Sequence, residues 1–292
     1  MAPKGTELRW GVEQRLEFIE FRLFWEGGIN RADITGFFGV SVPQASKDLS
    51  QYQELAPHNL RYDRSEKRYF AAPTFKPLYL KPDADRYLTE LARSAEPAAH
   101  GEQSWLLAPP SIDTLPLPHR RVETSVLRPL LEAIREERAV EIFYQSMNNQ
   151  RPDPIWRAIS PHAFGSDGLR WHVRAYCHLE RKFKDYILSR CIEVRASDEK
   201  GARKEDDKGW NEFFDVILEP NPALSENQRK VIALDYDMED GRTAIPVRRA
   251  LLYYFQKRLR LDVAEALDDP KEAPVVVMNR AEFKEALEQA SR

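Results

Sequence analysis

Side chains that could read DNA bases are concentrated in residues 41–51. Glutamine can pair bidentately with adenine, lysine can reach guanine or a phosphate, and serine can donate and accept shorter hydrogen bonds. The apolar residues of this segment recur at helical spacing, so the polar ones would lie on the outer face of a helix. The candidates are Ser41, Gln44, Ser46, Lys47, Ser50 and Gln51.

Cationic side chains follow in residues 59–72. These residues alternate on both sides of Arg64-Ser65-Glu66, which predicts a two-stranded hairpin. Arginine and lysine on such a hairpin would contact phosphates or the minor groove. The candidates are Arg61, Arg64, Lys67 and Arg68. Any exposed helix carries polar residues, so the interpretation depends on the elements around them.

The elements before the hairpin have the order of a helix-turn-helix. Apolar residues at helical spacing predict a first helix over 12–25. Asn30 and Ser41 are typical N-cap residues, and they begin an expected second helix at 31–38 and a third that ends near Leu55. Together with the basic hairpin, this order indicates a winged helix-turn-helix that binds DNA.

The first predicted helix carries two apolar stripes. The second consists of Phe18, Phe21 and Trp25. A surface helix needs only one stripe, so we expect the second to pack against a neighbouring domain or a second subunit. The proline-rich residues 96–122 read as a linker, within which Trp105-Leu106-Leu107 is expected to dock on a surface.

A second chemical pattern lies in residues 169–177, which alternate like a strand. His172, Arg174 and Tyr176 fall on one face together with the following His178, and Trp171, Val173, Ala175 and Cys177 fall on the other, expected as core. Arginine binds phosphate bidentately and aromatic rings stack on bases, so the first face suits an anionic ligand. The alternative is a solvated face whose arginines pair with Glu193 or Asp185.

These patterns predict an α+β multidomain chain. We expect a winged helix-turn-helix in 1–95, the linker in 96–122, a small β-barrel or sandwich with a preceding helix in 123–200, and a small α/β module in 201–292. The predicted strands of the β domain are 139–146, 156–164, 169–177 and 184–194. The module is predicted to hold strands 213–220 and 274–278, helices 225–234, 246–259 and 280–290, and a leading loop at 200–211. The apolar run Leu251–Phe255 is expected in the core or at a subunit interface.

Charge and composition restrict the function further. The 292 residues carry a net charge of −3, and residues 1–70 hold ten basic and ten acidic side chains. DNA affinity must therefore come from local placement of charge and from two copies acting together. No apolar run approaches the ~20 residues of a membrane span. The N-terminus has no apolar signal core and the two cysteines cannot build a disulfide framework, so we expect a cytoplasmic protein.

Enzyme and metal sites find no support in the sequence. There is no phosphate-binding loop, GxSxG or HExxH motif, and no cofactor is expected. Asp85, Asp206 and Asp207 lie in charged loops or helix starts, where solvation is the expectation. The histidines and cysteines of the β domain lack the spacing of a zinc site. These are His162, His172, His178, Cys177 and Cys191.

The β domain resembles a WYL domain. The resemblance rests on Tyr144-Gln145-Ser146, Pro161-His162, the run Trp171–Tyr176 and Leu188-Ser189-Arg190. His172 and Val173 depart from the Trp-Tyr-Leu triad of the family, as in the WYL regulators beside phage-defence operons of the BREX and CBASS types. The resemblance covers nearly the whole chain, including the winged helix and a C-terminal dimerisation extension.

The resemblance implies a homodimeric transcriptional regulator, usually a repressor, on a palindromic DNA operator. It also implies a pocket for a nucleic-acid fragment or nucleotide-like effector. The implied ligand residues are Tyr144, Ser146, His162, His172, Arg174, Tyr176 and Arg190. The alternative is an accessory protein that binds nucleic acid and modulates a partner helicase or nuclease.

Overall fold

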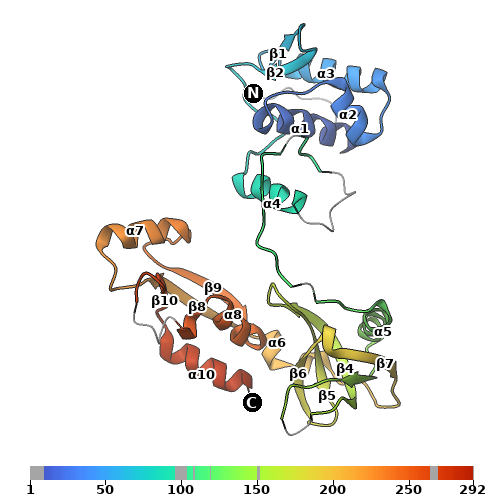
Figure 1. Cartoon of the computed structure of the whole chain (residues 1–292), viewed down its shortest axis with the longest axis vertical. Helices are drawn as coiled ribbons and strands as arrows, with labels where there is room; N and C mark the ends of the chain where they lie inside the picture. Colours follow the sequence, from blue (N-terminus) through green and yellow to red (C-terminus); the bar gives the residue numbers. More distant parts are fainter. Residues whose placement is uncertain are drawn as a thin grey trace. The chain divides into compact units, whose positions relative to one another are not determined.

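The computed structural model describes residues 10–95, 104–107, 109–118, 120–149, 152–263 and 269–291. It divides into two compact units, Met1–Pro116 and Leu117–Arg292. Each unit has its own hydrophobic core and is described by itself (Figure 1).

The N-terminal unit begins with three helices in the predicted order. They are α1 (Trp10–Trp25), α2 (Arg31–Phe38) and α3 (Val42–Leu55). The Asn30 side chain caps α2 within a reciprocal capping box with Asp33, and Gly39 ends that helix in the left-handed conformation. The Ser41 side chain caps α3. The predicted helix starts are therefore confirmed.

A hairpin of β1 (Leu60–Asp63) and β2 (Arg68–Ala71) follows α3 and forms the wing. Tyr69 of β2 also exchanges backbone hydrogen bonds with Ile29, which ties the wing to the start of α2. A fourth helix, α4 (Ala84–Ser94), is capped by Asp83.

The second apolar stripe of α1 is covered from within the same unit. Phe21 packs with Leu80, Leu91 of α4 and Leu106 in a separate small core. Trp105 lies edge-on to both Phe18 and Phe21, with ring centroids 5.6 and 5.3 Å apart. The predicted docking of the tryptophan segment is confirmed, and neither a neighbouring domain nor a second subunit is needed to cover the stripe.

The second unit opens with α5 (Thr124–Arg135) and a five-stranded antiparallel sheet in the order β6-β5-β4-β3-β7. The strands are β3 (Val140–Tyr144), β4 (Ile155–Ser166), β5 (Trp171–Cys177), β6 (Lys182–Ile187) and β7 (Cys191–Ala196). The prediction of one strand over 184–194 is wrong, because the 3-10 turn η2 (Leu188–Arg190) sends β6 and β7 to opposite edges. Leu188 and Cys191 are both buried, so the hydrophobic pattern continues through the turn and hides it.

The C-terminal module contains a three-stranded antiparallel sheet in the order β10-β8-β9. Its elements are η3 (Lys204–Asp206), α6 (Lys208–Asn211), β8 (Phe213–Pro220), α7 (Glu226–Asp235), β9 (Thr243–Arg248), η4 (Arg249–Leu251), α8 (Leu252–Arg258), β10 (Val275–Val277) and α10 (Arg280–Ser291).

Two predictions for this module are wrong. The expected helix over 246–259 starts only at Leu252, because residues 243–248 pair with β8 as an edge strand that tolerates Pro246. The expected loop at 200–211 contains η3 and α6, and Asp207 caps α6 through the backbone N–H of Trp210.

Candidate nucleic-acid interface and anion-binding site

The outer face of α3 presents the predicted base-reading residues. The side chains of Lys47 and Ser50 are exposed, and those of Ser46 and Gln51 are half-buried. Ser41 is exposed at the start of the helix, where its hydroxyl accepts a hydrogen bond from the Gln44 N–H. Ala45, Leu49 and Tyr52 are buried on the opposite face, as predicted.

Gln44 is partly engaged inside its own unit. Its side-chain amide donates to Asp48 Oδ1 at 2.8 Å. Asp48 is fully buried and also accepts from Arg15 Nε at 2.7 Å. The hydrogen bond to Asp48 engages one of the two amide N–H groups of Gln44, so its second N–H and its carbonyl oxygen are left for adenine, and Lys47 is exposed for contact with DNA.

The wing carries Arg61, Arg64 and Lys67 on its exposed surface. Asp63 supports the turn by accepting hydrogen bonds from the Ser65 N–H and hydroxyl. Arg68, the fourth predicted contact, is half-buried instead. It donates to the Gly28 carbonyl at 2.9 Å and lies 3.3 Å from Asp33, so it holds the wing against α2.

The balanced charge of the first 70 residues is unevenly distributed. Arg15 pairs with buried Asp48, and Arg22 pairs with Glu26 and Asp33. Among the residues described, Arg64 and Lys67 on the wing and Lys47 on α3 lie in no ion pair. Among the described residues of this stretch, three of the four cations without an acidic partner lie on the two elements expected to meet DNA, and the fourth is Arg31 of α2.

One supporting residue of this unit was not predicted from the sequence. Glu20 is fully buried and accepts hydrogen bonds from the backbone N–H groups of Leu78, Tyr79 and Leu80, each at 2.7 Å. It also accepts from the Tyr52 hydroxyl at 2.8 Å. A helix with apolar stripes on two sides was an available signal that an acidic residue between them would be buried and paired.

In the second unit, β5 alternates as predicted for most of its length. Val173, Ala175 and Cys177 are fully buried in the core. Trp171 is an exception, because it lies at the start of the strand with 57% of its surface exposed. On the other face His172 and Arg174 are also buried, because α6 and α8 of the C-terminal module cover them.

Arg174 is bound by carboxylates of its own chain. Its Nε and Nη2 donate to the two oxygens of Asp207 at 2.8 and 2.9 Å, and its Nη1 lies 3.4 Å from Asp185. His162 Nε2 lies 2.9 Å from the same Asp207. Burial alone would raise the pKa of Asp207, but hydrogen bonds from His162 and Arg174 lower it to about 2. Asp207 was expected in solvent, and that expectation is wrong.

His172 is covered by an aromatic ring. It stacks on Tyr254 of α8, with ring centroids 4.5 Å apart and planes 23° apart. Neither ring nitrogen of His172 has a hydrogen-bond partner in the described part of the chain. Burial lowers the pKa of His172; the charge of Asp167 opposes this effect, and those of Arg170 and Arg190 reinforce it.

The other predicted ligand residues also have partners within the chain. Arg190 is half-buried and hydrogen-bonds Tyr144, whose hydroxyl also accepts from the Ile187 N–H. Tyr176 lies edge-on to His178 and Phe183. Ser146 is half-buried and accepts a hydrogen bond from the Asn148 N–H. We call His162, His172, Arg174, Tyr176 and Arg190 the Arg174 face.

Most residues of the apolar run Leu251–Phe255 pack against other parts of the same chain. Leu252 is fully buried, and Leu251 and Phe255 pack against the same core. Tyr254 contacts His172, which leaves Tyr253 as the exposed member.

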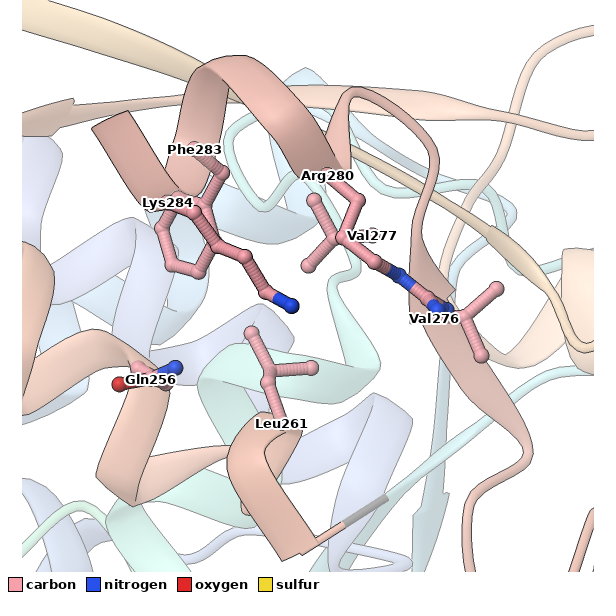
Figure 2. Close-up of a pocket in the computed structure, with 7 residues that line it drawn as sticks. All are labelled: Gln256, Leu261, Val276, Val277, Arg280, Phe283 and Lys284. Carbon is pink, nitrogen blue, oxygen red and sulfur yellow. The ribbon is translucent and has the colours of Figure 1, made fainter. Parts of the chain in front are cut away.

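A small pocket between α8, β10 and α10 lies outside the Arg174 face (Figure 2). Its floor of Leu261, Val277 and Phe283 belongs to the core of the module, and Arg280 and Lys284 stand at its rim. It contains none of the predicted ligand residues. Among the described residues, no three acidic, histidine or cysteine side chains are grouped as a metal site, and no helix is long and apolar enough to span a membrane.

Family models match three successive parts of the chain. The BrxR transcriptional regulator winged helix-turn-helix domain matches residues 11–93. The WYL domain matches residues 125–196, and the BrxR transcriptional regulator C-terminal dimerization domain matches residues 213–283.

Similar proteins match over almost their full length. The DNA-binding transcriptional repressor CapW of Stenotrophomonas maltophilia is 40% identical over 282 residues, covering 96% of this chain and 94% of that protein. CapW proteins of Escherichia coli strain KTE188 and Pseudomonas aeruginosa are each 40% identical, covering 98% of this chain and 95% of theirs. The solved structure of proteasome accessory factor B/C of Arthrobacter aurescens is 16% identical, with a TM-score of 0.26. The match covers 96% of this chain and 48% of that one.

Proposed function

This chain belongs to the family of DNA-binding transcriptional repressors that includes CapW, and from that premise we propose that it binds a palindromic operator as a homodimer. The observation that carries the proposal is the exposure of Lys47 on the outer face of α3, together with the exposed cations Arg61, Arg64 and Lys67 of the wing. A two-fold dimer would present two such faces to two half-sites. The resemblance to WYL regulators is confirmed, and the family is one of repressors rather than enzymes.

The second part of the proposal is an effector site on the Arg174 face. We propose that a nucleic-acid fragment or nucleotide binds there and alters operator binding. Two arginines and several aromatic rings support this, because guanidinium groups bind phosphate and rings stack on bases. We also propose that the controlled genes form a phage-defence operon, that the protein acts in the cytoplasm, and that its domains divide at 95, 122 and 200.

The third part concerns the surface that joins two copies. Helix α7 has ten residues, none of them buried, although a capping box of Ser225 and Gln228 starts it. A helix this short gains little stability without packing partners. Its Leu234 is 81% exposed and Val231 is 55% exposed. Figure 1 shows α7 at the end of the module opposite α6. An open groove beside α7 is lined by Pro220, Glu226, Arg229, Lys230, Ala233, Leu234, Met238 and Gly241.

The occupant that we propose for this surface is α7 of a second copy. The helix lies inside residues 213–283, which match a dimerization domain. Its exposed Val231 and Leu234 are apolar side chains that two copies related by a two-fold axis would bury against each other.

The test of the DNA-binding assignment is Lys47→Glu. We expect operator affinity in a gel-shift assay to fall by at least about 100-fold, since each protomer loses a base or phosphate contact and gains repulsion. Lys81→Glu is the matched control, because Lys81 is exposed on the same unit but outside α3 and the wing. It should bind within a few-fold of the wild type. Both variants should remain dimers, and nanomolar operator binding by Lys47→Glu would refute the role of α3.

A further inference from the structure

The Arg174 face is already occupied by two side chains of the chain itself. Asp207 fills the bidentate position on the Arg174 guanidinium, and Tyr254 stacks on His172. A carboxylate offers two oxygens to a guanidinium in the same way as a phosphate does. A phenol ring on an imidazole has the arrangement that a stacked base would adopt.

The two side chains also share a third group. Asp185 lies 3.4 Å from Arg174 Nη1 and accepts a hydrogen bond from the Tyr254 hydroxyl at 3.3 Å. Asp207 and Tyr254 are therefore connected through Asp185, although one precedes α6 and the other lies in α8. Moving either side chain would disturb the contacts of the other.

We propose that Asp207 and Tyr254 form an internal latch that mimics the effector and must be displaced when the effector binds. This inference rests on the proposed effector site. The effector would exchange a phosphate for the Asp207 carboxylate and a base for the Tyr254 ring. The ligand class is thus a nucleotide or oligonucleotide that offers both groups.

The buried state of His172 supports exchange rather than a permanent core contact. Both of its ring nitrogens lack hydrogen bonds among the described residues, and buried polar atoms in this state are rare. The Tyr254 ring cannot satisfy them by stacking, whereas a base edge or a phosphate can. The latched state therefore leaves His172 with hydrogen-bonding capacity that the effector would use.

Displacing Asp207 would also loosen the junction between the β domain and the C-terminal module. Asp207 caps α6, which directly precedes β8. Helix α6 approaches the arginine closely, since a Cβ on Gly209 would lie 2.8 Å from Arg174 Nη2. The indole of Trp210 lies against the Arg248 guanidinium of β9, 4.8 Å away. The latch thus connects the effector site to the module that carries α7.

The test uses the full chain and fluorescein-labelled oligothymidylate as the probe. Asp207→Asn keeps the size and an acceptor oxygen but removes the charge that competes with phosphate. We expect about tenfold tighter probe binding by fluorescence anisotropy. Asp206→Asn is the matched control, because it makes the same charge change at an exposed neighbouring residue. It should bind like the wild type. In the double variant Asp207→Asn, Arg174→Gln the gain in probe affinity should disappear. This result would show that the probe binds at the Arg174 face.

Each outcome decides one question. If folded Asp207→Asn binds no more tightly than the wild type, the latch is refuted and the effector site stands. If neither the wild type nor any variant binds the probe, the proposed effector site fails, and the latch fails with it. If thermal melting shows that Asp207→Asn is unfolded, probe binding by Tyr254→Ala tests the latch instead, because this variant removes the ring that stacks on His172. Tighter binding supports the latch, and unchanged binding refutes it.

Discussion

Burial between β5 and α8 makes His172 harder to protonate in the folded protein than in the unfolded chain. Its pKa is lowered from the ordinary 6.5 mainly because the charged form would lose its water. The unfolded chain therefore binds more protons than the folded protein just below pH 6.5. Folding stability should then fall as the pH decreases through this window and be independent of His172 above it.

We expect His172→Phe to remove this acid sensitivity. Near pH 7.5 the free energies of unfolding should differ little, since Phe keeps the ring on Tyr254 and removes two unpaired nitrogens. Near pH 5.5 the variant should be the more stable protein. Each tenfold difference in proton affinity of His172 between the unfolded and the folded state corresponds to about 1.4 kcal/mol in the free energy of unfolding. Denaturant titrations at both pH values measure the difference.

The control for the pH experiment is His58→Asn, because His58 is exposed in the N-terminal unit. Its stability should still fall toward low pH, because His172 is unchanged in this variant. If the His172→Phe curve runs parallel to that of the wild type, the imidazole does not titrate differently in the folded state.

At single residues, the sequence predicts surface chemistry better than long-range pairing. Lys47 and Arg64 are exposed where the local pattern placed them, because each position follows from its own helix or hairpin. Asp207 was mistaken for a solvated acid, since its partners Arg174 and His162 are 33 and 45 residues away in the chain. A local pattern contains no record of such partners.

The same distinction holds for helices and strands. Asn30 and Ser41 mark the starts of α2 and α3 correctly, because a cap bonds to residues within its own first turn. Residues 246–248 were taken for helix because their pairing with β8 involves residues more than thirty positions earlier, namely 213–215. The break at η2 was missed because the apolar Leu188 lies in the turn itself and continues the apolar pattern of the strand.

Among the helices, α7 allows a direct test of the dimer surface. We expect Leu234→Glu to shift the protein from dimer to monomer, because each copy would bring an uncompensated charge into an apolar contact. Sedimentation equilibrium at micromolar concentration measures the change. Leu179→Glu is the matched control, since Leu179 is also exposed, at 55%, but lies on the turn between β5 and β6.

The control should remain dimeric. A Leu234→Glu protein that associates as tightly as Leu179→Glu would show that α7 is not the contact. Both variants should remain folded by circular dichroism, since neither side chain is buried within a single protomer.

For the whole molecule, the net charge of −3 means that attraction to DNA comes from a few placed cations. Each protomer offers Lys47, Arg61, Arg64 and Lys67. Four cations are too few for tight binding at physiological salt, so occupancy of an operator depends on joining two protomers. The weak link between overall charge and DNA binding is also why composition alone gave no indication of this function.

The requirement for two protomers can be tested by measuring how operator affinity changes with salt concentration. If all eight cations of a dimer contact phosphates, the logarithm of affinity should fall against the logarithm of salt concentration with a slope of about −7. The monomeric Leu234→Glu protein should show about half that slope, because it carries one set of cations. Anisotropy titrations of an operator duplex between about 50 and 200 mM salt give both values.

A wild-type slope near −2 would mean that the wing does not touch the DNA backbone. Equal slopes for the two proteins would mean that a single protomer makes all the contacts, which would remove the reason for a palindromic operator.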